Sequence, residues 1–325
     1  MSGPPYHLRI NKAADRFALI EAIRLMPRLG LDLKDFTYLS FGGSYLEDMR
    51  LMYEFFPQIS MISVDKSPEV CKRQEFHRPC GKIRIENCEM GSFIDRNELD
   101  DEKCIVWLDY TNIKPSNIKE FQDILRQVAQ GSIIKITLQA DPRHYWKFPR
   151  WEGDDYKLMN HPTRRFKEDF EKLIPNPSAD LPRKFEDFAF LIQEILQIAA
   201  GRALEWDSLG FYPVSSFYYS DGTWMFTLTG LLWPHKDKQK IFDIFQDYDF
   251  SNLTWDKPRL IKLPHLSTKE RMHLQNLLPC RDTRVAILRR ALNYSLEDND
   301  RSTEEALAQY AAFHRYYPYY LRGVP

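Results

Sequence analysis

Two adjacent glycines, Gly42 and Gly43, follow a short β-prone run and precede a helical pattern, and this feature constrains the fold most. The β-prone run is Phe-Thr-Tyr-Leu-Ser-Phe over residues 36–41. After the glycines, apolar residues recur on one helical face, at Leu46, Met49, Tyr53 and Phe56. Glycine permits a tight turn and lets a ligand come close to the backbone. The sequence therefore predicts a strand, a tight turn and a helix.

The same alternation of strand and helix repeats along the chain. Further short apolar runs predict strands over 60–64, 82–87, 104–108 and 132–138. Strands that alternate with helices form a parallel sheet covered on both faces. Two aromatic runs over 211–219 and 223–232 flank Asp221-Gly222, a strong hairpin signal. We expect a Rossmann-like α/β fold: a mostly parallel sheet with an antiparallel edge hairpin, followed by a small helical domain.

Changes in composition and apolar spacing along the sequence suggest three segments. Residues 1–35 form an N-terminal helical segment, with a helix expected over 11–29. Residues 36–235 form the sheet domain, and a proline-rich stretch over 142–184 reads as an insertion on the substrate side. Residues 236–325 read as a mostly helical C-terminal domain, because its apolar residues recur at helical spacing.

Composition argues against several classes of protein. The 45 basic and 46 acidic residues nearly cancel, so attraction of nucleic acid by the whole surface is not indicated. The five cysteines are odd in number and form no CxxC pair, which suggests neither a disulfide framework nor a zinc site. No stretch resembles a signal peptide or reaches transmembrane length without a charge. We expect a cytoplasmic protein with no metal and no membrane association.

Polar residues follow several of the predicted strands. Parallel strands joined by right-handed crossovers place their carboxyl ends at one edge, where ligands of open α/β sheets bind. The glycine pair, Asp65, the segment at Glu89 and Asp109 all map to this edge. Asp65 ends the second strand, where a carboxylate can accept hydrogen bonds from ribose hydroxyls; it could also simply cap the next helix. Asp109 could orient a substrate, act as a base, contact a cofactor or be satisfied by nearby backbone N–H groups.

Weaker signals surround this edge. Glu89 and Met90 follow the third strand and could contact a purine ring. Asn117 and Glu120 are spaced as an N-cap and its return partner for a helix over 117–130. The complete GxGxxG fingerprint and the GK[ST] phosphate loop are both absent, which lowers the case for NAD and ATP. A packing turn without a ligand is the alternative interpretation of the glycine pair.

The motifs Tyr38-Leu-Ser-Phe-Gly-Gly43, Ile62-Ser-Val-Asp65, Asn87-Cys-Glu-Met90 and Val106-Trp-Leu-Asp-Tyr110 occur in an order that resembles the class I S-adenosylmethionine (SAM)-dependent methyltransferases. The resemblance covers about residues 36–233. The stretch Leu8-Arg-Ile-Asn-Lys-Ala-Ala-Asp-Arg16, with Trp107-Leu-Asp-Tyr-Thr111, is also similar to bacterial proteins called "putative O-methyltransferases".

This resemblance implies an enzyme that transfers a methyl group from SAM to an unidentified acceptor. Asp109 would lie near the reacting methyl group and accept a proton or orient the acceptor, with Tyr110 shaping the acceptor pocket. Cofactor contacts would come from the methionine-lining Phe41, Gly42 and Gly43, the ribose-binding Asp65, and the adenine-flanking Glu89 and Met90.

Two departures from the family pattern bear on the activity. Ser44 and Tyr45 stand where the family's glycine loop usually has a further glycine. The sequence after Val106 keeps an acid and an aromatic residue, Asp109 and Tyr110, but lacks the prolines of the [DN]PP[FYW] signature. The second departure disfavours methylation of adenine or cytosine nitrogens.

Two rival hypotheses stay open. The chain could bind SAM, or have lost catalysis, and act through protein partners that dock on the C-terminal helical domain. It could instead methylate nucleic acid, since basic and aromatic residues interleave over 143–167 and such residues contact phosphates and bases. The nearly balanced charge counts against the second rival.

Overall fold

The computed structural model describes residues 9–147, 162–279 and 285–318. By its contacts the chain divides into two compact units. The larger unit holds Leu19–Tyr218 and Thr223–Arg259, and the smaller one Met1–Ala18, Tyr219–Gly222 and Leu260–Pro325. The division into the three segments expected from the sequence stays a prediction. Cys280 and the segment 148–161 of the expected insertion lie outside the described residues.

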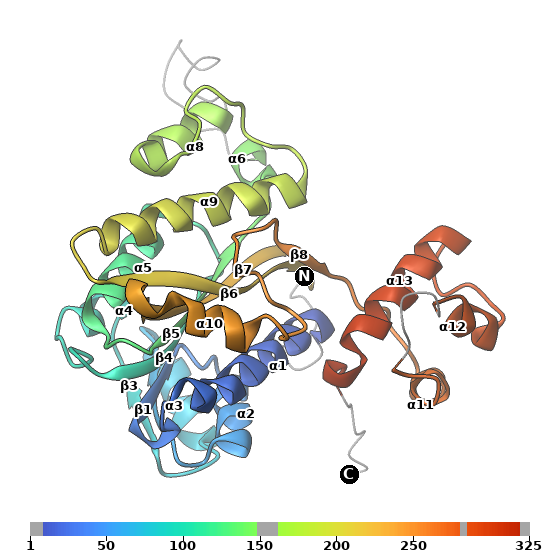
Figure 1. Cartoon of the computed structure of the whole chain (residues 1–325), viewed down its shortest axis with the longest axis horizontal. Coiled ribbons are helices and arrows are strands. Elements are labelled where there is room, and N and C mark those ends of the chain that lie inside the picture. The colour runs from blue at the N-terminus through green and yellow to red at the C-terminus, as the bar shows by residue number, and fades with distance from the viewer. Residues whose placement is uncertain (1–8, 148–161, 280–284, 319–325) are drawn as a thin grey trace. The chain divides into compact units, whose positions relative to one another are not determined.

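A sheet of eight strands, in the order β3-β2-β1-β4-β5-β7-β6-β8, organises the fold (Figure 1). The strands are β1 (Phe36–Ser40), β2 (Ser60–Val64), β3 (Ile83–Glu86), β4 (Lys103–Asp109), β5 (Ile133–Gln139), β6 (Leu209–Ser220), β7 (Trp224–Pro234) and β8 (Arg259–Ile261). The pairs among β1 to β5 are parallel, and β7 runs antiparallel to β5. This sheet confirms the predicted fold class, and β8 is the one strand in it that the sequence did not predict.

Helices of the larger unit follow the first strands in alternation. They are α2 (Glu47–Phe55), α3 (Pro68–His77), α4 (Met90–Ile94) and α5 (Pro115–Gln127). The long α9 (Phe185–Ala203) precedes the edge hairpin and lies beside α5, where Gln122 Nε2 donates to the Ala199 carbonyl oxygen at 3.0 Å. The inner faces of both helices are buried and apolar. These helices supply the cover that the uniformly buried middle strands, β4 and β5, require.

The helical part that follows β5 is anchored by aromatic rings. It contains α6 (Arg143–Lys147) and α8 (Pro162–Phe170), drawn next to α9 in Figure 1. The Tyr145 ring lies 5.1 Å from that of Phe166, which lies 5.5 Å from that of Phe188 on α9. Edge-to-face packing of this kind buries large apolar area. The described part of the expected insertion is therefore packed on α9.

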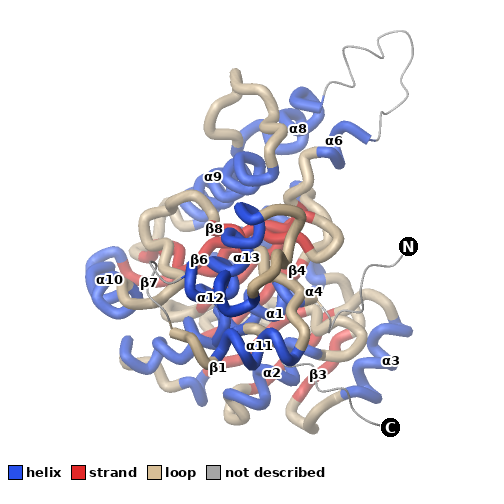
Figure 2. The backbone as a smooth tube through the Cα atoms, turned by 90° about the vertical axis from the view of Figure 1, so that its right-hand side faces the viewer, coloured by secondary structure: helices blue, strands red, loops and turns tan. Residues whose placement is uncertain are grey.

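The smaller unit is held together by side-chain hydrogen bonds and by packing between its helices. Asn11, at the start of α1 (Ile10–Leu25), donates through Nδ2 to Asp221 Oδ1 at 2.9 Å and accepts the Leu263 N–H at 2.8 Å. Helices α11 (Thr268–Gln275), α12 (Val285–Leu292) and α13 (Asp300–Phe313) pack in sequence, as Figure 2 shows. Ser267 caps α11 with a full capping box. These contacts tie the two ends of the chain to the tip of the edge hairpin.

One helix start differs from its prediction. Helix α5 begins at Pro115, not Asn117, and Asn117 is its third residue, whose Oδ1 accepts the Lys114 N–H at 2.9 Å. Proline fits the first helical turn because that turn's N–H groups lack helical partners. Glu120 is therefore no capping partner and is free for another contact. Within the described ranges, no helix is long and apolar enough to cross a membrane.

Candidate active site

The order in which the chain adds strands to the sheet reverses at β1. From β1 the chain adds β2 and β3 on one side, whereas β4 and β5 lie on the other. The carboxyl ends of β1 and β4 therefore flank the position where open α/β sheets usually bind their ligands, which we call the crevice. Ser40 ends β1 and Asp109 ends β4. The glycine pair and Tyr110 follow directly, so the structure brings these predicted site residues together.

The two glycines of the turn have different surroundings. Both adopt left-handed backbone angles, with φ of +65° at Gly42 and +59° at Gly43. A Cβ on Gly42 would lie 2.6 Å from both Leu46 Cδ2 and Ser63 Oγ, whereas one on Gly43 would meet no atom within 4 Å. Gly42 is thus enclosed by the protein. Gly43 presents an open backbone surface that a ligand can approach.

A buried amide holds the glycine turn from beneath. Gln74 of α3 is fully buried and donates through Nε2 to the carbonyl oxygens of Phe41 and Gly43, each at 3.0 Å. The Ser63 hydroxyl, on β2, lies 3.2 Å from the same Phe41 oxygen and 3.0 Å from Gln74 Oε1. These contacts fix the carbonyls of the turn. The turn is therefore shaped before any ligand arrives.

A carboxylate on α2 supports the other side of the turn. Asp48 Oδ2 accepts hydrogen bonds from Tyr38 Oη at 2.7 Å and from Ser40 Oγ at 2.5 Å. Ser40 Oγ in turn accepts the Gly42 N–H at 3.1 Å. This chain of bonds joins strand, turn and helix start. Sequence reasoning assigned no role to Asp48, although its place one turn after the glycines was a usable signal.

Asp65 follows β2 and is partly buried beside the crevice edge. Its Oδ1 accepts the Ser67 N–H at 2.8 Å, which orients the carboxylate and helps start α3. Among the described residues, Oδ2 has no hydrogen-bond donor. Asn87 Nδ2 donates to the Asp65 carbonyl at 3.0 Å and fixes the backbone. One carboxylate oxygen is therefore structural and the other is available to a ligand.

The two residues expected beside a purine differ in exposure. The Glu89 side chain is largely exposed and lies 3.5 Å from Lys66 Nζ. Met90 is 4% exposed and is the first residue of α4. Glu89 is thus placed at the rim, whereas Met90 is mostly enclosed by the protein.

Asp109 lies at the end of a row of buried polar groups on one sheet face. It pairs in register with Thr137, and it shares its face with Trp107 because side chains alternate along a strand. Trp107 Nε1 donates to Thr137 Oγ1 at 2.9 Å. The fully buried Lys135 ammonium lies 5.1 Å from the centre of the Trp107 ring system. Sequence reasoning missed Lys135, although a lysine inside an apolar strand run is itself a signal.

Tyr110 lies against Phe41 and a second acid. The two rings are 5.3 Å apart, edge to face, across the carboxyl ends of β1 and β4. The Tyr110 hydroxyl donates to a carboxylate oxygen of Glu120 on α5. Burial, with the Glu120 charge, raises the pKa of Tyr110 above its ordinary range. Tyr110 therefore stays protonated and forms a wall of the crevice.

Glu120 is a site residue that the sequence did not reveal. Burial raises the pKa of its carboxyl, the Tyr110 hydrogen bond opposes that effect, and the charge of Glu89 adds to it. A Cβ at Gly91, in the first turn of α4, would lie 3.3 Å from Glu120 Oε1. The carboxylate thus stands between Tyr110 and α4. The helical spacing had suggested only a capping role.

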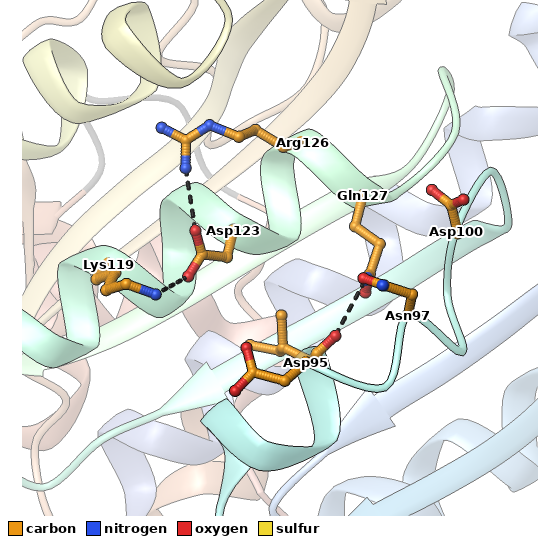
Figure 3. A pocket seen from close by; sticks show the side chains of 8 residues that line it. Asp95, Asn97, Asp100, Lys119, Asp123, Arg126 and Gln127 are labelled. Carbon is orange, nitrogen blue, oxygen red and sulfur yellow. Dashed lines mark hydrogen bonds and ion pairs between the residues drawn. The ribbon is translucent and has the colours of Figure 1, made fainter.

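A separate polar pocket of about 380 Å³ lies between the segment after α4 and α5 (Figure 3). Its charges are partly paired internally: Asp123 contacts Lys119 at 2.7 Å and Arg126 at 3.0 Å. No residue of the glycine turn lines it. This pocket is therefore distinct from the crevice.

Within the described ranges, no group of three or more His, Cys, Asp or Glu side chains is placed to hold a metal ion.

A family model described as "Putative O-methyltransferase" matches residues 4–324, nearly the whole chain. No curated protein sequence matches the chain. The match covers both compact units, so it does not rest on the sheet alone.

Solved structures with a similar course of the chain include several methyltransferases. Trm1 from Pyrococcus horikoshii, in complex with SAM, is 11% identical with a TM-score of 0.47, over 75% of this chain and 61% of that one. A "putative O-methyltransferase" from Klebsiella pneumoniae is 11% identical with a TM-score of 0.38, over 70% and 83% of the two chains. This chain thus spans less than two thirds of Trm1.

Proposed function

This chain belongs to the "Putative O-methyltransferase" family, a family of SAM-dependent methyltransferases, and from that premise we propose that its crevice binds SAM and methylates a hydroxyl acceptor. The observation that carries the proposal is the family match over residues 4–324, together with the glycine turn at the strand switch point.

The residues of the crevice fit SAM. Gly43 offers an open backbone face where a side chain would otherwise stand, which suits the close approach of the methionine part. Asp65 offers one carboxylate oxygen without a donor among the described residues, which suits ribose hydroxyls. Phe41 and Tyr110 supply an aromatic boundary between the two strand ends. Glu89 and Met90 are proposed for the adenine side, Glu89 by polar contact and Met90 by packing.

SAM, when bound, supplies an electrophilic methyl group. The protein's part is to position the acceptor oxygen and to take its proton, since alignment lowers the barrier of a displacement. We assign proton acceptance, or orientation of the hydroxyl, to Asp109, which ends β4 at the crevice. Tyr110 is assigned a positioning role, because its hydroxyl is committed to Glu120.

Thermal unfolding with SAM and with its demethylated product tests the proposal. A ligand at about 100 times its dissociation constant stabilises the native state by about 2.7 kcal/mol. We expect both compounds to raise the unfolding temperature by a few degrees. No shift with either compound would remove the cofactor assignment.

A second candidate function is a SAM-binding protein that acts through a protein partner. The observation that favours it is a set of large apolar side chains exposed on the C-terminal helices and their connections: Met272, Leu277, Ile287 and Tyr294. Retained SAM binding with no methyl transfer to any hydroxyl acceptor offered would favour this function.

A cytoplasmic location is also part of the proposal. Support comes from the cysteines that the structure describes, Cys71, Cys80, Cys88 and Cys104, which are all free thiols. Free thiols persist in reducing compartments. Formation of a disulfide in the protein isolated from cells under non-reducing conditions would count against this location.

A further inference from the structure

An apolar pocket of about 230 Å³ lies on the side of α9 that faces α8 and the segment 174–182. The opposite side of α9 is buried against the rest of the larger unit, through residues such as Ile192 and Leu196. None of the residues proposed to bind SAM lines this pocket. It is therefore a second hollow, built by different elements.

The walls of the pocket are those of a small-molecule site. Apolar side chains that line it are Phe166, Ile174, Leu181, Phe190 and Leu191. Apolar cavities with a few polar groups are the usual form of such sites. A cavity of about 150 Å³ is large enough to hold benzene in other proteins. The space here suits one aromatic ring, or a similar apolar body, with a short side chain.

The charged groups of the pocket favour a cation. Glu194 is half-buried and has no hydrogen bond or ion pair within the described part of the chain. Burial raises the pKa of its carboxyl, because it removes the charged form from water. Asp187 is already paired with Lys257 at 3.3 Å. Asp180, which is exposed, adds a third carboxylate to the lining, whereas the lining has one lysine, Lys167.

We infer that this pocket binds a primary amine carried on an apolar ring or chain, with the ammonium group at Glu194 and the apolar body among the aromatic and aliphatic walls. Lys167 does not compete for Glu194 in the structure, since no ion pair joins them among the described residues. Its long side chain can hold its charge in water. The inference goes beyond the proposed methyl transfer and does not depend on it.

Binding of 2-phenylethylamine to the full chain, measured by calorimetry at neutral pH, tests the inference. The matched probes are 2-phenylethanol, which has no charge, and 3-phenylpropionate, which has the opposite charge. We expect the amine to bind about tenfold more tightly than the alcohol, the ratio that corresponds to about 1.4 kcal/mol. The anion should bind weakest. Equal affinity for amine and alcohol, or no binding of the amine, would overturn the inference.

Two variants locate the site. Glu194→Gln should remove the preference for the amine over the alcohol, and Glu186→Gln, an exposed position of the same helix outside the pocket lining, should keep it. Glu186→Gln should unfold at the temperature of the parent, and Glu194→Gln at that temperature or above it, because it removes a partly buried charge. Both variants should retain the stabilisation by SAM. A preference unchanged by Glu194→Gln, or lost equally in Glu186→Gln, would contradict the assignment. Loss of SAM binding alone would speak against the proposed function and leave the amine site standing.

Discussion

Replacing each glycine of the turn by alanine separates packing from ligand approach. Gly42 and Gly43 have nearly the same left-handed φ, +65° and +59°. A left-handed conformation costs a non-glycine residue about 1–2 kcal/mol. Removing a glycine from the unfolded chain returns about 0.4–1 kcal/mol. We therefore expect Gly43→Ala, whose new methyl group meets open space, to lose about 1 kcal/mol of unfolding free energy.

Gly42→Ala carries the same backbone cost and a steric one. Its methyl carbon would lie 2.6 Å from Leu46 Cδ2 and from Ser63 Oγ, well inside normal contact. Both neighbours are buried, so relief requires shifts in the core. Overpacking of this kind costs about 1–3 kcal/mol. The backbone terms cancel between the two variants, so the difference in stability measures packing alone.

Urea unfolding, followed by far-UV circular dichroism, gives the comparison, and titration with SAM gives the second readout. We expect Gly42→Ala to be less stable than Gly43→Ala by about 1–3 kcal/mol. We expect Gly43→Ala to fold well and yet bind SAM more weakly, because its methyl group enters the space assigned to the ligand. Equal stabilities would refute the packing argument. Full SAM affinity in Gly43→Ala would remove the ligand from this turn.

Three further substitutions test the remaining assignments. Asp65→Ala should weaken SAM binding by about 1–3 kcal/mol, the cost of losing hydrogen bonds to a charged acceptor, and unchanged affinity in calorimetry would place the ribose elsewhere. Asp109→Asn should keep SAM affinity and lower turnover about 100-fold or more, and full activity would make Asp109 a structural residue. Burial raises the pKa of the Glu120 carboxyl above its usual 4.5, so the folded state favours the protonated form. The contribution of this carboxyl to the free energy of unfolding is therefore complete below pH 4.5 and is lost as the pH rises through the raised pKa. Glu120→Gln should therefore gain stability relative to the parent as the pH rises above 4.5, and a difference independent of pH would contradict the burial argument.

Local sequence patterns were sufficient to predict the sheet apart from β8. The apolar runs that became β1, β2, β4 and β5 were recognisable because strands buried on both faces have few polar residues. The hairpin of β6 and β7 was signalled by Asp221-Gly222, and Gly222 has the positive φ that this turn requires. Even the edge of the sheet that carries the candidate site followed from the handedness of the connections.

The start of α5 was predicted wrongly, because the spacing of its polar residues is compatible with more than one set of hydrogen-bond partners. Asn117 and Glu120 have the spacing of a capping box, yet Pro115 starts the helix one turn earlier than this spacing implies. Asn117 then serves as the third residue of α5, and Glu120 is left to accept the Tyr110 hydroxyl. Sequence spacing alone cannot distinguish these outcomes, because both satisfy the helical period.

The sequence by itself determined the order of strands and helices, the position of the glycine turn and the family of the protein, since these depend on residues close together in the chain. Only the tertiary structure decided which glycine is enclosed and which acid meets Tyr110. Those facts depend on Ser63, Gln74 and Glu120, which reach the site from other elements. Hydrogen bonding and steric exclusion act across space, so packing of the helices on the sheet determines them.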